Sequence, residues 1–492
     1  MEPAGTLERG LTVLRTLAAE PRQARATDLV RATGLARSTV DRVLATLAQL
    51  GYVRLEERAV LLAPRLMELG EAYLACGGLR DTLSPLAERL AEEVDDSVSL
   101  AVRDADGVRF VSQFTRRRTM SVAFRVGDLL PADRCAAGLV LLDPAAPWAE
   151  DDQLIEPGLI AVAVPVRDAA GEVACALSVV SHTSRHTVAG LRAHALPRMR
   201  ATVAEMEAAL SGPAPVPAPR PAVPAVDTSR AVKQELGAGY LQSLARGLAV
   251  LVSLGSARGG LTLAEAAKAT GLPRATVRRA VQTLERLGYA TAEGSRFVLL
   301  PRVLELGYAD LSGLSFGEIV QPHLADLVAR VHESASVAVL SGDDVVYVAR
   351  VPTVNIMRVN ITVGTRFPAY ATSMGRVLLA GVSGERLASI IPRPLTRHTV
   401  TSAERLATAV RQAAADGYAL VDQELEEGVR SIAVPVRDRT GRVVAAVNVA
   451  THAGRATRDD LLRDVLPALT ETAARMEADL AHTRVTPLGG FR

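Results

Sequence analysis

The stretch Ala32-Thr-Gly-Leu-Ala-Arg-Ser-Thr-Val40 occurs a second time as Ala269-Thr-Gly-Leu-Pro-Arg-Ala-Thr-Val277. In both, a glycine suited to ending one helix is followed by polar residues that suit the start of another. Around the second stretch, apolar spacing predicts helices over 241–255, 263–269 and 274–287, with Pro273 at the start of the third. Short strands over 289–291 and 296–299 follow, joined at Glu293-Gly294. Three helices and a hairpin predict a winged helix-turn-helix, present twice.

The repeat extends well beyond these helices. Residues 7 to about 143 match residues 244 to about 380 at an offset of 237 positions. Farther on, Ala163-Val-Pro-Val-Arg-Asp168 matches Ala433-Val-Pro-Val-Arg-Asp438 at an offset of 270. The first copy therefore lacks 33 residues between the two blocks. We interpret the chain as one two-domain module written twice, with an incomplete first copy.

A proline-rich stretch separates the copies. Residues 211–224 read Ser-Gly-Pro-Ala-Pro-Val-Pro-Ala-Pro-Arg-Pro-Ala-Val-Pro, and alternating proline excludes helix and favours an extended strut. The 492 residues are too many for one core. We therefore predict five regions: a winged helix-turn-helix over 1–63; a linker helix and truncated effector-like domain over 64–210; the Pro-rich linker over 211–235; a second winged helix-turn-helix over 236–300; and a linker helix and effector-binding domain over 301–485. Mixed helices and antiparallel-type strands predict the α+β class, with PAS/GAF-like effector domains.

Composition limits the partners and the compartment. Lysine and arginine number 56 and aspartate and glutamate 54, so DNA contacts must come from local basic clusters. No apolar run is long enough to cross a membrane and no signal peptide begins the chain, so we expect a cytoplasmic protein that does not engage membranes. Cys76, Cys135 and Cys175 form no CxxC pair, and no metal-spaced set of ligands is present. We predict no metal and no cofactor.

The third helix of each winged domain carries the candidate DNA-reading side chains. These are Arg37, Ser38, Thr39 and Arg42 in the first copy, and Arg274, Thr276, Arg278 and Arg279 in the second, with Arg296 in the second wing. A single arginine on a helix is usually a solvated side chain, but the set recurs on a repeated frame and predicts binding to a double-stranded DNA operator. The helices differ, with Ser38 against Ala275 and Asp41 against Arg278, so we expect unequal reading of one sequence.

These residues resemble the IclR family of bacterial transcription regulators. The likeness rests on the stretches 263–279, Thr372-Ser-Met-Gly-Arg-Val-Leu-Leu379 and 422–435, and it covers nearly the whole chain except the Pro-rich stretch. Residues 336–350 and 363–370 are similar to the subgroup that regulates aromatic-acid breakdown through protocatechuate and β-ketoadipate. The resemblance implies a sequence-specific regulator that answers to a small aromatic acid or dicarboxylate and controls aromatic-acid catabolism.

The resemblance also implies an effector pocket in the second copy. Its residues would be Thr372, Ser373, Met374, Asp422, Glu424, Ser431 and Ala433. The helix starting near Ser373 offers free N–H groups to an anion. Arg358 and Arg366 are candidate charge partners for a carboxylate. Because family members pair through their winged domains, we expect the tandem chain to form a homodimer that imitates a tetramer.

The first copy departs from this pattern. Cys135 replaces Thr372, and Ala136-Ala137 replaces Ser373-Met374. We expect no clear counterpart for Asp422 or Glu424, because Asp151 and Asp152 lie near the gap but out of register. A sensor domain that lacks one wall should not hold a ligand, so we predict one effector per chain, in the second copy.

Two other functions are compatible with the residues. The chain could be an enzyme that acts on a small carboxylate in the same pocket, with His332-Glu333, His398 or His452 as acid–base groups. No activated nucleophile or phosphate loop supports this alternative, and we predict no catalytic residue. The three cysteines could instead form a thiol redox sensor. Turnover of an aromatic acid would indicate the enzyme, and loss of regulation on cysteine-to-serine replacement would indicate the sensor.

Overall fold

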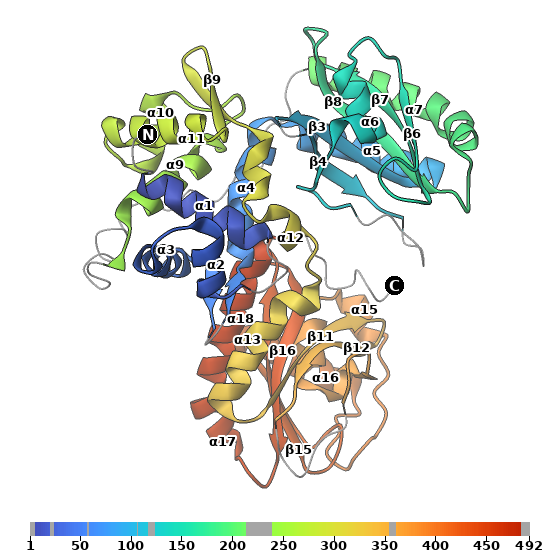
Figure 1. The fold of residues 1–492 in the computed structure, drawn as a ribbon. Coiled ribbons are helices and arrows are strands. Elements are labelled where there is room, and N and C mark those ends of the chain that lie inside the picture. The colour runs from blue at the N-terminus through green and yellow to red at the C-terminus, as the bar shows by residue number, and fades with distance from the viewer. Residues whose placement is uncertain are drawn as a thin grey trace. The chain divides into compact units, whose positions relative to one another are not determined.

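The computed structural model describes residues 5–19, 24–56, 59–105, 107–116, 124–212, 239–353 and 361–483. These residues form two units, Met1–Gly313 and Leu314–Arg492. The first unit holds both winged domains and the first effector-like domain, and the second unit holds the second effector-like domain (Figure 1). The predicted linker over 211–235 lies outside the described residues apart from Ser211 and Gly212. The bounds of the five predicted regions stay predictions.

Each winged domain has three helices followed by a two-stranded hairpin. The first contains α1 (Thr6–Ala19), α2 (Ala26–Thr33), α3 (Arg37–Gln49), β1 (Val53–Leu55) and β2 (Val60–Leu62). The second contains α9 (Gln242–Leu254), α10 (Leu263–Thr270), α11 (Arg274–Arg286), β9 (Ala290–Glu293) and β10 (Arg296–Leu299). Local sequence sets the ends of α10, because Thr262 and Glu265 cap each other's backbone at its start and Gly271, at φ 67°, ends it. Both predicted winged helix-turn-helix folds are present.

The connection out of each wing differs between the copies. In the first, η1 (Pro64–Leu66) runs into α4 (Met67–Cys76). In the second, η4 (Pro301–Glu305) and α12 (Tyr308–Ser312) are separated by Gly307, whose φ of 102° no helix accommodates. The apolar spacing of residues 301–312 predicts one helix there, and the structure shows that this prediction was wrong at this glycine.

The effector-like domains repeat one antiparallel sheet of six strands. The first is built from α5 (Leu79–Val94), β3 (Ser97–Asp104), β4 (Gly107–Phe114), β5 (Leu129–Leu130), η2 (Ala132–Arg134), α6 (Ala136–Leu142), β6 (Ala149–Asp152), β7 (Leu159–Arg167), β8 (Val173–His182) and α7 (Val188–Ser211). The second is built from α13 (Phe316–Val331), β11 (Ser334–Ser341), β12 (Asp344–Val351), β13 (Arg366–Pro368), η5 (Ala369–Ala371), α14 (Ser373–Leu379), α15 (Gly384–Ala388), α16 (Ala403–Asp416), β14 (Ala419–Asp422), β15 (Val429–Arg437), β16 (Val443–His452), α17 (Arg458–Asp460), the π-helical η6 (Leu461–Val465) and α18 (Leu466–Ala481). The strand orders β5-β4-β3-β8-β7-β6 and β13-β12-β11-β16-β15-β14 correspond strand for strand. The α+β class is therefore confirmed.

The residues that the first copy lacks correspond to a segment that forms two helices in the second copy. The segment between α14 and β14 contains α15 and α16, whereas α6 and β6 are joined by a short loop without a helix. The sheet is intact on both sides of the gap, since β6 pairs with β7 in the same register as β14 with β15: Ala149 faces Ala163, and Ala419 faces Ala433. The expectation that Asp151 and Asp152 lie out of register was therefore wrong. Asp152 occupies the position of Asp422, and the sheet register agrees with the sequence likeness of Asp152-Gln153 to Asp422-Gln423 at the offset of 270.

The second sheet has a different core on each face. On one face, α13 and α18 lie side by side over Val337, Val434 and Val447 (Figure 1). On the other face, α14 and α16 cover Ala338, Ala433 and Ala446. At these positions the second face has alanines where the first face has valines. The sequence of residues 457–480 predicts one long helix; the structure confirms its extent, with a π-helical turn at Leu461–Val465.

No helix within the described ranges is long and apolar enough to cross a membrane.

Candidate DNA-reading helices and effector pocket

The helices α3 and α11 bury one face and expose the other. Val40, Val43, Leu44 and Leu47 anchor α3, and Val277, Ala280, Val281 and Leu284 anchor α11. This burial leaves Arg37, Ser38 and Arg42 exposed on α3 and Arg274, Arg278 and Arg279 exposed on α11; Thr39 and Thr276 are half-buried. The predicted reading residues thus share the solvent face of each helix.

Some of these arginines are already engaged. Arg37 Nε donates to both carboxylate oxygens of Asp41, at 2.9 and 3.0 Å. Arg296 donates to the carbonyl of Gly260 at 2.7 Å and to Glu265 at 3.1 Å, which ties the wing to the start of α10. Across the residues that the structure describes, Arg274, Arg278 and Arg279 pair with no carboxylate. The exposed cations of α11 therefore remain available, whereas α3 neutralises one of its own.

The two winged domains pack against each other through reciprocal contacts of α1 and α9. A side chain at Gly10 would collide with Leu244, and a side chain at Gly247 would collide with Leu7. These pairs are equivalent under the internal repeat, as the two halves of a two-fold interface would be. Arg286 of α11 also bonds to Glu8 at 2.7 Å. The geometry presents α3 and α11 as a pseudo-symmetric pair within one chain.

The start of α14 brings together the predicted effector residues. Thr372 caps the helix by accepting from the backbone N–H of Gly375 at 2.9 Å. The Oγ atoms of Ser373 and Ser431 are 2.9 Å apart, which joins the helix to β15. Met374 and Ala433 are buried in the apolar cluster beside them. These five residues form one continuous wall between sheet and helix.

The two predicted acidic residues are held by arginines of their own. Arg376 donates to Glu424 at 2.6 Å in a buried pair, and the same carboxylate accepts from the backbone N–H of Val400 at 3.1 Å. Arg430 donates to Asp422 at 2.9 Å. Burial raises the pKa of Asp422, but bonds from Arg430 and Gln423 outweigh it and hold the pKa below its ordinary value. Glu424 fastens the α14 helix to the loop after β14, and both carboxylates serve as structural partners of arginines.

A cross-strand row of polar residues lies beside the predicted pocket residues and was not among them. Ser336 faces Arg350 on one side and Asn448 on the other, and Asn448 faces Ala433. Ser336 and Asn448 are buried, and burial lowers the pKa of the half-buried Arg350 guanidinium. Because opposed residues share a face, this row lies on the α14 side of the sheet. The sequence feature that could have indicated this row is the presence of single polar residues within strands that are otherwise apolar.

The candidate charge partners lie elsewhere. Arg366 pairs with Asp344 at 3.2 Å on the exposed edge of the sheet, and Arg358 lies outside the described residues. Arg350 is the cation that β12 brings into the row instead.

The first copy has a different lining at the same place. Cys135 caps α6 as Thr372 caps α14, but Ala136 and Ala161 replace the serine pair. The rings of Phe110 and Phe124 stack at 5.2 Å, and buried Asp151 accepts from the backbone of Leu154 at 2.7 Å. The cavity between them measures about 20 Å³, room for little more than one water molecule. Burial raises the pKa of Asp151.

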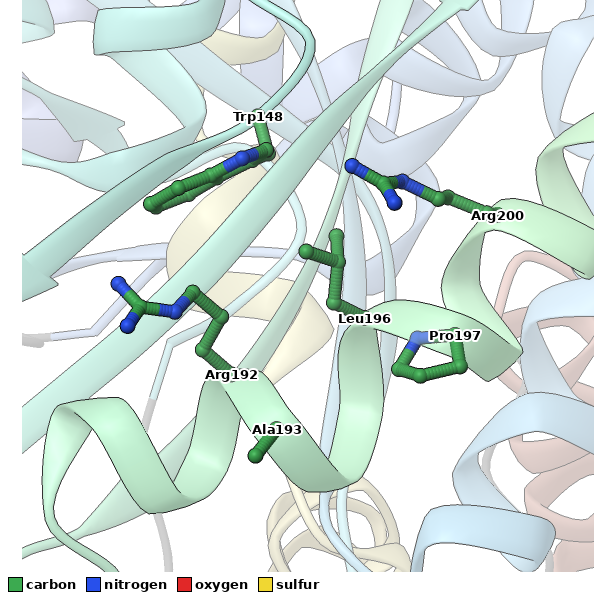
Figure 2. A pocket seen from close by; sticks show the side chains of 6 residues that line it. All are labelled: Trp148, Arg192, Ala193, Leu196, Pro197 and Arg200. Atoms are coloured by element: carbon green, nitrogen blue, oxygen red, sulfur yellow. The ribbon is translucent and has the colours of Figure 1, made fainter.

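A larger hollow of about 520 Å³ lies on the outside of the first effector-like domain (Figure 2). The Arg192 guanidinium lies 5.0 Å from the ring centre of Trp148 and donates to Glu150 at 2.9 Å. Ala193, Leu196, Pro197 and Arg200 of α7 complete its lining. This hollow is open to solvent, and its residues belong to the first effector-like domain, whereas the predicted pocket residues belong to the second. Its Arg192 already donates to Glu150. The hollow is therefore not the predicted pocket.

The alternatives gain little from the geometry. All three cysteines are buried, and burial raises the pKa of Cys135 to about 11 and of Cys175 to about 12, which disfavours the reactive thiolate. Within the described ranges, no cluster of histidine, cysteine and carboxylate side chains could hold a metal ion. His452 accepts from the backbone N–H of Gly454 at 3.1 Å in a tight turn.

Comparison with known proteins agrees with this arrangement. The family described as IclR helix-turn-helix domain matches residues 6–57 and 243–294, and that described as Bacterial transcriptional regulator IclR C-terminal matches 71–147, 144–208 and 309–478. The Pca regulon regulatory protein of Pseudomonas putida is 45% identical over 49% of this chain and 84% of its own length. The p-hydroxybenzoate hydroxylase transcriptional activator of Acinetobacter baylyi is 34% identical over 48% of this chain and 90% of its own.

Among solved structures, a transcriptional regulator of Rhodococcus sp. RHA1 is 50% identical, with a TM-score of 0.45, over 49% of this chain and 98% of that one. The proteins matched are transcriptional regulators about half as long as this chain. Since the two families together span most of the sequence and each recurs, the chain belongs to the IclR family of bacterial transcriptional regulators, with its DNA-binding and C-terminal domains both present in tandem.

Proposed function

We propose that this protein regulates genes of aromatic-acid catabolism and answers to a small aromatic or carboxylic acid bound in its second effector domain. The observation that carries the proposal is the polar row of Arg350, Ser336 and Asn448 beside the Ser373–Ser431 pair. A guanidinium and small hydroxyl groups on an otherwise apolar face suit a carboxylate attached to a ring. The likeness to the Pca and p-hydroxybenzoate regulators supports the choice of aromatic acids.

One effector binds per chain. A buried carboxylate needs partners for its charge, and the first copy offers Gln113 where the second has Arg350. Asp151 would repel an anion there, and the two stacked phenylalanines occupy the space. Thr372, Ser373, Met374, Ser431 and Ala433 line the working pocket, and Asp422 and Glu424 keep its wall in place through their arginines.

Calorimetry on the full chain tests the effector proposal. Protocatechuate, 4-hydroxybenzoate and β-ketoadipate are the probes, and the best of them should bind with a stoichiometry near one. Ser431→Phe fills the pocket and should abolish the heat of binding, whereas Ala414→Phe, on the exposed face of α16, should preserve it. A stoichiometry near two, or binding that survives Ser431→Phe, would exclude the proposed site.

The DNA contacts are proposed for Arg37, Ser38, Thr39, Arg42, Arg274, Thr276, Arg278, Arg279 and Arg296. Arg279→Ala or Arg42→Ala should each weaken operator binding by about 1–3 kcal/mol if the side chain reads a base. Arg330→Ala is the control variant, because it removes the same charge from an exposed position on α13. Fluorescence anisotropy with a labelled operator measures the effect. If Arg279→Ala and Arg42→Ala both leave the affinity for the operator and its salt dependence unchanged, these helices do not contact DNA.

We further propose that the chain is a covalent pseudo-dimer and that two chains associate as a pseudo-tetramer. The reciprocal Gly10–Leu244 and Gly247–Leu7 contacts support the first part. The two sheets, flanked by helices, are proposed to be of the PAS/GAF-like type.

A further inference from the structure

We infer that this chain binds an operator with two unlike half-sites in a fixed order, and that Asp41 and Arg278 set the difference. The inference rests on the proposed DNA binding and deepens it. A homodimer carries two identical reading helices and therefore favours a palindrome. This chain instead joins two different helices covalently, so its operator need not be symmetric.

The frame that presents the two helices is symmetric. Leu7 and Gly10 of α1 contact Gly247 and Leu244 of α9, and each pair is the repeat of the other. The caps and burial of α3 and α11 also match, with Val40 and Val277, or Leu47 and Leu284, at equivalent buried positions. The scaffold would therefore place both helices on DNA in equivalent ways.

The reading faces differ at the position that Asp41 and Arg278 share. Both side chains are exposed, one turn into their helices. Each is followed by an arginine, Arg42 in α3 and Arg279 in α11, which is the same residue in both copies. Asp41 also holds the Nε of Arg37 at 2.9 Å, whereas Arg274, the counterpart of Arg37, has no carboxylate within the described part of the chain. Compared with α11, α3 therefore differs at two cations: Asp41 stands where α11 has Arg278, and it also restrains Arg37, the counterpart of Arg274.

The chemistry of the two faces predicts different bases. Arginine bonds best to the O6 and N7 atoms of guanine, and it attracts phosphate. A carboxylate accepts from the N4 amino group of cytosine and repels phosphate. We assign a guanine-contacting, strongly salt-dependent half-site to α11 and a weaker half-site of different sequence to α3. The stronger half-site belongs to the copy whose effector domain keeps the serine pair and Arg350.

Selection of bound duplexes from a randomised pool, with the full chain, tests this inference. The expected result is a site with two unlike halves. A palindrome built from either half should bind about tenfold more weakly or worse, as a lost bidentate base contact would cause. Asp41→Arg should shift the preference towards the palindrome of the α11 half and steepen the salt dependence by about one phosphate contact.

Two variants complete the design. Glu404→Arg makes the same change of charge on the exposed start of α16 and should leave the selected sequence unchanged. Arg278→Asp should weaken the α11 half-site specifically, which keeps the test decisive if Asp41→Arg does not fold. A wild-type chain that selects a palindrome, or an Asp41→Arg chain that selects the wild-type site, would overturn the inference and leave DNA binding standing. A wild-type chain that retains no sequence at all would instead overturn the proposed function.

Discussion

The buried pair of Arg376 and Glu424 fixes one wall of the proposed effector pocket. The two side chains meet at 2.6 Å, and each is about nine-tenths buried. Two charges removed from water stabilise a fold only while both are present, because a lone buried charge has lost its solvation without compensation. The role of Glu424 is therefore to hold α14, and through it Ser373, in place.

Arg376→Met should lower the free energy of unfolding of the effector domain by about 3–5 kcal/mol, because it leaves the Glu424 carboxylate buried and unpaired. The double variant Arg376→Met, Glu424→Gln should recover part of that loss. Urea unfolding followed by circular dichroism measures both. Arg366→Ala, which breaks an exposed pair with Asp344, is the comparison and should cost no more than about 1 kcal/mol. Equal losses in the free energy of unfolding for Arg376→Met and Arg366→Ala would refute a special role for the buried pair.

Asp460 gives the second residue-scale prediction, on acid stability. Bonds from the hydroxyl and backbone of Thr457, followed by Arg463, lower the pKa of this carboxyl to about 2 from 3.8. A carboxyl whose pKa is depressed on folding stabilises the fold above its unfolded value, and this stabilisation is lost as pH falls. Unfolding measured between pH 4 and pH 2 should show that loss, and Asp460→Asn should remove this part of the pH dependence. Identical pH profiles for both proteins would contradict the assignment.

At the scale of elements, packing of α1 on α9 depends on two glycines. A Cβ at Gly10 would overlap the side chain of Leu244, so the helices approach more closely than any other residue would permit. Gly10→Val should therefore lower the free energy of unfolding of the first unit by about 1–3 kcal/mol. Gly384→Ala, in a helix where an added Cβ meets nothing, should be neutral or slightly stabilising. Thermal unfolding of the two variants checks the difference, and matching shifts would show that the helices do not pack this closely.

Elements with local signals were predictable from the sequence, and those fixed by distant contacts were not. Thr262, Glu265 and Gly271 mark both ends of α10 within the segment itself. The break at Gly307 was missed because apolar spacing continues through it. The Arg376–Glu424 bond could not be predicted, because it joins residues 48 positions apart. The pocket residues around Ser373 came from family likeness, but the row of Ser336, Arg350 and Asn448 required the strand register.

At the scale of the whole molecule, duplication has let the copies specialise. The first copy lacks counterparts of α15 and α16 and has only a small cavity over its sheet, whereas its winged domain still packs against the second one. Selection on such a chain can alter one reading helix or one sensor without altering the other. A regulator built from identical subunits lacks that freedom, because every substitution appears twice.

The association of the winged domains should not depend on the Pro-rich linker between them. A protease site inserted near Pro219 allows the chain to be cut after folding, and the halves should then remain together on a sizing column at micromolar concentration. The contacts of α1 with α9, the bond from Arg286 to Glu8 and the contact of Arg80 with Tyr308 at 3.3 Å would hold them. The cut Gly10→Val chain should separate more readily, because the overlap with Leu244 weakens that interface while leaving each half able to fold. Wild-type halves that separate on cutting would show that the linker, and not the helix interface, makes the pseudo-dimer.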